Sequence, residues 1–139
     1  MKTWSAMYLL IWVALLQILI ILFPVLSKSS TYDLHGVVGV AVVALAMYSY
    51  SKVRKTDCPE RIKRISKATG ILGVVQGVLG LILFAGIIIH FGSTFQTVIL
   101  FLHVMNALAI ITQASSSATA YDMWEEREFL QAPSSAKPV

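Results

Sequence analysis

The segment Phe101-Leu-His-Val-Met-Asn-Ala-Leu-Ala-Ile-Ile-Thr-Gln113 is an apolar run with three large polar side chains set into it. They are the imidazole of His103 and the amides of Asn106 and Gln113. A polar group buried in a hydrophobic segment needs a hydrogen-bond or metal partner, because an unsatisfied buried group is costly. The run therefore predicts a buried helix whose histidine has a partner elsewhere in the chain.

The composition around this run is typical of a membrane protein. Of the 139 residues, 57% are hydrophobic and 13% are charged, and the mean hydropathy is +0.76. A soluble domain has about a quarter of its residues charged. Four apolar runs reach the length of about 20 residues that crosses a bilayer. The composition predicts an all-α fold, namely an integral membrane four-helix bundle with little soluble domain.

The expected spans leave only a short tail outside the bundle. They cover residues 5–26, about 33–53, about 68–90 and about 95–120. The first span is expected to be uncleaved, since a signal peptide has a shorter apolar core. Residues 1–120 would form the transmembrane domain and residues 121–139 a cytoplasmic C-terminal tail.

The charge distribution predicts the orientation of the chain. The stretch 52–67 holds seven Lys and Arg residues against Asp57 and Glu60, and basic loops stay on the cytoplasmic side. Both termini would then be cytoplasmic, in a multi-pass protein of the cell membrane in contact with lipid. The net charge of +4 needs no nucleic acid to explain it.

Several kinds of chemistry are disfavoured by what the spans contain. Cys58 is the only cysteine, so a catalytic cysteine pair is excluded. Apart from histidine, no ionisable side chain lies well inside a span, whereas transporters and pumps generally place one along their pathway.

Two histidines are placed to hold one metal centre. His35 opens the second span, and His103 lies at a similar depth if the second helix starts a turn earlier, at about residue 31. Two imidazoles on facing helices can ligate one heme iron from opposite sides. Gly36, Gly39 and Ala107 would leave room for a porphyrin edge. This pattern predicts a heme site with His35 and His103 as metal ligands, and the family resemblance described below implies heme b as the heme type.

Other interpretations of these polar residues stay open. Each histidine can instead be an interhelical hydrogen-bonder, and His90 at a span border needs no function. A zinc or copper site needs a third ligand, for which His90 is the one candidate. The buried amides of Asn106, Gln113 and Gln76 need partners too. The glycines at 70, 73, 77 and 80 share one helical face, which favours helix packing over ligand contact.

Two short motifs carry a family resemblance. The segments Gln76-Gly-Val-Leu-Gly-Leu81 and Leu102-His-Val-Met-Asn-Ala107 resemble helices of the heme A synthase family. The resemblance implies a four-helix unit with heme-ligating histidines at positions 35 and 103. This chain has Thr31 and Gly36 where the family's catalytic half-site has a glutamate and commonly an arginine, and it lacks the outer-loop cysteine pair found in many members.

The function expected from these observations is electron transfer. The chain would be a small cytochrome b-like subunit of a respiratory or other membrane redox complex, in contact with other membrane subunits or a second copy of itself. One alternative is a heme A synthase-like enzyme working as a dimer, with Asp33 as its carboxylate. Another is an accessory subunit without cofactor. The sequence leaves open whether the protein catalyses a reaction.

Overall fold

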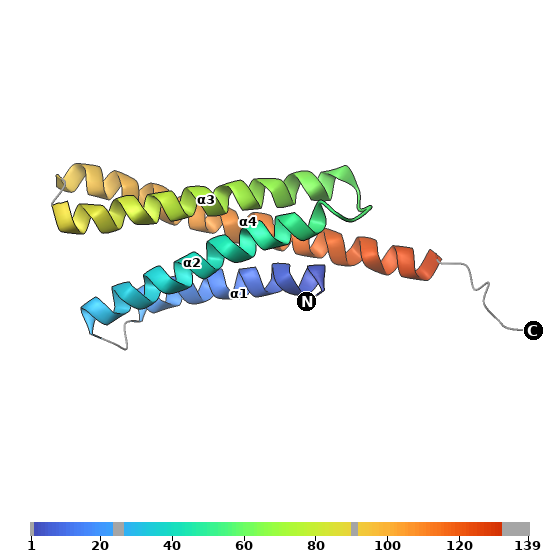
Figure 1. Ribbon diagram of the computed structural model, residues 1–139, viewed down its shortest axis with the longest axis horizontal. Helices are drawn as coiled ribbons and strands as arrows, with labels where there is room; N and C mark the ends of the chain where they lie inside the picture. Colours follow the sequence, from blue (N-terminus) through green and yellow to red (C-terminus); the bar gives the residue numbers. More distant parts are fainter. Residues whose placement is uncertain (1, 24–26, 90–91, 132–139) are drawn as a thin grey trace, which may run out of the picture.

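Four helices make up almost all of the computed structural model, which describes residues 2–23, 27–89 and 92–131 (Figure 1). They are α1 (Thr3–Leu22), α2 (Lys28–Val53), α3 (Glu60–Ile89) and α4 (Ser93–Gln131). All four are long and apolar enough to cross a membrane. The predicted all-α fold with four potential membrane spans is therefore confirmed.

The connection between α1 and α2 is shorter than predicted. Helix α1 ends at Leu22, and Phe23 has non-helical backbone angles of φ −125° and ψ 71°. A residue that precedes a proline, here Pro24, is disfavoured in the helical region. Helix α2 then begins at Lys28, where the side chain of Ser27 accepts a hydrogen bond from the Ser30 N–H.

Helices α3 and α4 are both longer than predicted. Helix α3 begins at Glu60 instead of residue 68, directly after Pro59, and proline is well tolerated at a helix start. Helix α4 continues to Gln131 instead of ending near residue 120. No glycine or proline interrupts it, so the mixed-charge segment after Tyr121 extends the span as one helix.

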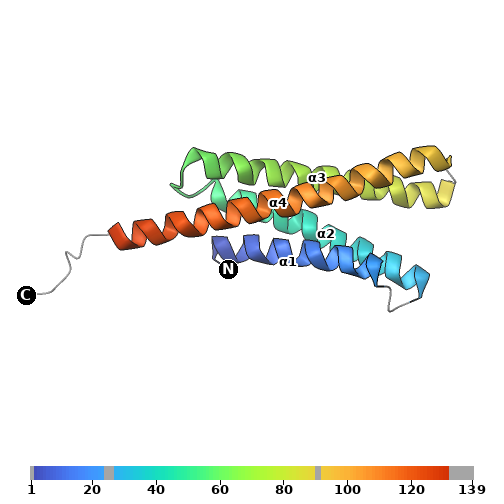
Figure 2. The same ribbon diagram turned by 180° about the vertical axis from the view of Figure 1, so that it is seen from behind.

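The helices are arranged in a ring in which each contacts its two neighbours. Helix α1 packs on α2 and α4, and α3 packs on the same two helices. We call the end with the α2–α3 connection, residues 54–59, the basic end. The opposite end, with the α1–α2 and α3–α4 connections, is the histidine end. The α1–α2 and α3–α4 hairpins separate toward the histidine end in both views (Figures 1 and 2).

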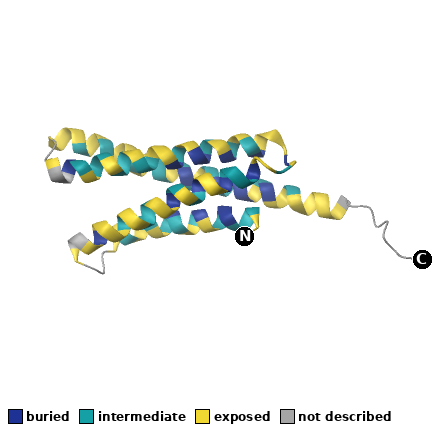
Figure 3. Cartoon of the chain, viewed as in Figure 1, coloured by how far each residue is buried: buried dark blue, intermediate teal, exposed yellow. Residues whose placement is uncertain are grey.

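Hydrophobic packing is concentrated toward the basic end (Figure 3). Two clusters of buried side chains fill this half of the bundle. The first consists of Met7, Val53, Cys58, Ile62, Ala118 and Tyr121, and the second of Leu10, Ala14, Val42, Ala46 and Ala114. Many of these residues are small, which lets helices approach closely where lipid reduces the hydrophobic drive for association.

The outer surface of the bundle is strongly apolar. Trp12 is 69% exposed, Val40 71% and Leu81 70%, and they come from three different helices. A soluble monomer rarely exposes apolar residues in such continuity. This surface fits acyl chains better than water.

The glycine face of α3 mainly packs against α2, as predicted. A Cβ atom on Gly73 would lie 2.8 Å from the Ala46 Cβ, and one on Gly77 would lie 3.3 Å from a Val43 methyl carbon. Gly80 differs, because a Cβ there would lie 3.4 Å from Cε1 of the His103 ring. Three glycines thus serve helix packing and the fourth borders a histidine.

We expect Gly73→Ala to destabilise the bundle, because the added methyl group overlaps Ala46 and forces α2 and α3 apart. The cost should be about 1–3 kcal/mol, the usual range for overpacking. Unfolding in mixed micelles, followed by circular dichroism, measures it. Gly36→Ala is the matched control, since nothing lies within 4 Å of its Cβ position. Equal stability of the two variants would contradict the packing role of Gly73.

Candidate functional site

Polar side chains from all four helices gather in the histidine half of the bundle. They are Gln17 from α1, His35 from α2, Gln76 from α3, and His103 and Asn106 from α4. Every buried hydrophobic side chain among the described residues lies on the basic-end side of this group. The buried hydrophobic side chains of the bundle therefore end at the level of these residues.

Gln17 and His35 join α1 to α2 by two reciprocal hydrogen bonds. The Gln17 side-chain amide donates to the backbone carbonyl of His35 at 2.8 Å. Nδ1 of His35 lies 3.2 Å from the Gln17 backbone carbonyl, which can only accept, so Nδ1 carries the proton. Nε2 of His35 consequently keeps its lone pair. Gly39 makes this pairing possible, because a Cβ there would lie 2.8 Å from the Gln17 amide nitrogen.

Asn106, Gln76 and His103 form a second chain of hydrogen bonds, between α3 and α4. The Asn106 amide donates to the Leu72 carbonyl at 2.9 Å and to Oε1 of Gln76 at 2.7 Å. The Gln76 nitrogen lies 3.1 Å from Nε2 of His103 and donates to it, since an amide nitrogen cannot accept. Nδ1 of His103 is buried without a hydrogen-bond partner among the described residues.

The two imidazole rings meet across the diagonal of the bundle. Their centroids are 6.2 Å apart and their planes are inclined at 53°. Metal–nitrogen bonds of about 2 Å, with about 1 Å from each nitrogen to its ring centre, put two rings on one metal about 6 Å apart. A direct hydrogen bond would bring them closer, because N–H donors lie about 3 Å from their acceptors. The spacing suits one atom held between the rings.

Within the described residues, no hydrogen bond joins the two hairpins at this end. The Gln17–His35 pair lies within the α1–α2 hairpin, and the Asn106–Gln76–His103 chain lies within the α3–α4 hairpin. The rings of His35 and His103 thus belong to different hairpins and approach each other to a centroid distance of 6.2 Å.

The other predicted site residues take no part in these hydrogen bonds. Gly36 is exposed with open space at its Cβ position, and Ala107 is half-buried one helical turn from His103. His90 lies outside the described residues. Asp33 is exposed on α2. A cluster of three or more metal-binding side chains does not occur in ranges 2–23, 27–89 and 92–131, so a multi-ligand zinc or copper site has no support there.

Two amides depart from expectation. Gln113, one of the amides expected to need a partner, takes no part in the described hydrogen bonds and lies ten residues, or about 15 Å, from His103 along α4. Gln17 was not predicted as a site residue, although it is the one strongly polar side chain in the first span. Gln17 can be identified by the rule that a polar residue within an apolar span has a functional or packing partner.

Comparisons with protein-family models, with curated proteins and with solved structures find no match to this chain. The resemblance to heme A synthases consequently remains a prediction from the two short motifs.

We expect Gln76→Leu and Asn106→Leu each to destabilise the α3–α4 hairpin by roughly 0.6–2 kcal/mol, the range for hydrogen bonds between membrane helices. The double variant should cost less than the sum, because both changes remove the same 2.7 Å hydrogen bond. Unfolding in mixed micelles gives these free energies. Gln113→Leu is the matched control and should be nearly neutral. Strict additivity would contradict the hydrogen-bond chain.

Proposed function

We propose that this chain is a membrane-embedded, cytochrome b-like heme protein in which His35 and His103 are the axial ligands. It would pass electrons as a subunit of a respiratory or other membrane redox complex. The observation that carries the proposal is the pair of neighbouring imidazoles, whose ring centroids are 6.2 Å apart and which come from the diagonally placed helices α2 and α4.

The surroundings of the pair are compatible with a flat apolar group. The chain's own buried hydrophobic side chains lie elsewhere, on the basic-end side of the histidines. Gly80 keeps α3 free of bulk beside the His103 ring. Few buried hydrophobic side chains of the protein lie in this half of the bundle, and a porphyrin would supply apolar surface there.

The hydrogen bonds around His35 fit the support that a metal-binding histidine usually receives. The Gln17 carbonyl holds the proton of His35 on Nδ1, which leaves Nε2 free to bind a metal. On the other side, Gln76 and Asn106 orient the His103 ring, and Nε2 of His103 would bind a metal only after giving up the hydrogen bond from Gln76. Heme, when bound, supplies the reversible one-electron change of iron, and these residues position its ligands.

The membrane arrangement is part of the proposal. The basic end lies in the cytoplasm, because it carries the basic stretch 52–67, and the histidine end faces the opposite side. Both termini are then cytoplasmic, in the cell membrane. Other membrane subunits or a second copy of the chain would exchange electrons with the heme, which lies near the outer face in this orientation.

We expect the purified protein to show a Soret band and sharp low-spin bands on reduction. His35→Ala and His103→Ala should each abolish or shift these bands, because each removes one axial ligand. A reduced-minus-oxidised absorption spectrum measures this. His90→Ala is the control and should keep the wild-type spectrum.

A featureless spectrum of wild-type protein, expressed with heme supplied and extracted in mild detergent, would contradict the heme proposal. In that case the histidines would be interhelical packing residues, and the chain a subunit without cofactor.

We also expect the basic end and the histidine end of the bundle to be labelled from opposite sides of the membrane. In a Cys58→Ser background, Thr94→Cys should react with a membrane-impermeant maleimide in intact cells, because the exposed Thr94 lies at the histidine end. Asp57→Cys, exposed at the basic end, should react only after permeabilisation. The reverse pattern would overturn the orientation.

A further inference from the structure

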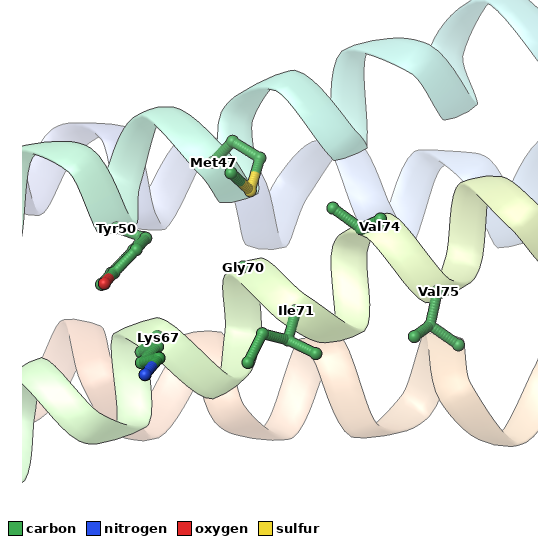
Figure 4. Close-up of a pocket in the computed structure, with 7 residues that line it drawn as sticks. All are labelled: Met47, Tyr50, Lys67, Gly70, Ile71, Val74 and Val75. Carbon is green, nitrogen blue, oxygen red and sulfur yellow. The ribbon is translucent and has the colours of Figure 1, made fainter.

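A groove on the outside of the bundle runs between α2 and α3 in the basic half (Figure 4). It has a volume of about 260 Å³ and is lined by Met47, Tyr50, Lys67, Gly70, Ile71, Val74 and Val75. At its floor the two helices are close, since a Cβ on Gly70 would lie 3.4 Å from the Tyr50 Cβ. The groove is separate from the histidine pair, which lies further along the bundle.

Apolar atoms line almost all of the groove. Its polar end is the one nearer the α2–α3 connection, where the side chains of Tyr50 and Lys67 lie (Figure 4). Met47, Ile71, Val74 and Val75 lead away from them and are all exposed. The eight residues from Lys67 to Val75 extend about 12 Å along α3. This order of groups matches a phospholipid, with its headgroup first and an acyl chain after it.

The charge at the polar end is available to bind an anion. In the part of the chain that the structure describes, the one ion pair joins Lys63 to Glu60 at 2.9 Å, and this partner raises the pKa of Lys63. Lys67 has no carboxylate partner there. Arg64 precedes it by three residues on the same side of the helix, so two cations lie in line with the groove.

We propose that this groove binds one anionic phospholipid of the leaflet at the basic end. Its phosphate contacts Lys67 and the Tyr50 hydroxyl, and one acyl chain lies along Ile71, Val74 and Val75. Basic pockets between membrane helices on the cytoplasmic side commonly bind acidic headgroups. The inference rests on the membrane insertion proposed above but does not depend on heme.

The test is native mass spectrometry of the full chain, after carbonate extraction of the membranes has confirmed insertion. The protein is equilibrated with phosphatidylglycerol or phosphatidylcholine of identical acyl chains. The wild type should retain phosphatidylglycerol in preference. Lys67→Gln should lower its retention about fivefold, the factor for about 1 kcal/mol per basic residue. Lys55→Gln, exposed in the neighbouring connection, is the matched control and should change little.

A second variant tests the apolar part of the groove independently of the Lys67 charge. Val74→Trp fills the apolar part from an exposed position, so folding should be unaffected, and retention of both lipids should fall. Equal retention of the two lipids by the wild type, or equal losses from Lys67→Gln and Lys55→Gln, would overturn the proposal. A lipid-free dimer that Val74→Trp dissociates would also overturn it, by assigning the groove to a second copy. Loss of insertion itself would instead contradict the membrane proposal.

Discussion

A buried amide or imidazole between long apolar helices has little water to bond, so it must find its partner on another helix. This constraint organises the histidine half of the molecule. Gln17 and His35 hold α1 against α2, and Asn106, Gln76 and His103 hold α3 against α4. The basic half is held differently, by small apolar residues in close contact. Hydrogen bonds thus hold each hairpin together, and apolar packing at the basic end joins the two hairpins.

This division explains why the histidines face each other as they do. The packed half brings all four helices together, while the other half lets the hairpins diverge (Figures 1 and 3). His35 and His103 come from diagonal helices, and their rings approach to a centroid distance of 6.2 Å. Their distance is set mainly by the hairpin angle, and the hydrogen bonds set the orientation of each ring.

Sequence reasoning predicted the coarse fold and the polar residues, because hydropathy and buried polarity are local properties. It identified four spans, and it placed His35 and His103 at one level. It could not predict how the amides pair, since Asn106 bonds Gln76 and not the histidine, and Gln17 was passed over. Those partners depend on which helices are neighbours and how each is rotated, and spacing along one helix does not specify either.

Helix boundaries were the weakest part of the prediction, for a related reason. Charge marks where a chain leaves the hydrocarbon, but a helix does not have to end there. Residues 60–67 and 121–131 are rich in charge and still helical, because no glycine or proline stops them before the connection or the tail. The spans are therefore shorter than the helices that contain them.

The length of α4 has a mechanical consequence. Its 39 residues make a rod of about 58 Å, nearly twice the roughly 30 Å of hydrocarbon that it would cross. It contains no glycine or proline at which it would bend. His103 and Trp124 therefore lie on one uninterrupted helix, about 32 Å apart. A displacement of α4 along its axis at His103 would therefore also move Trp124, near the other end of the helix.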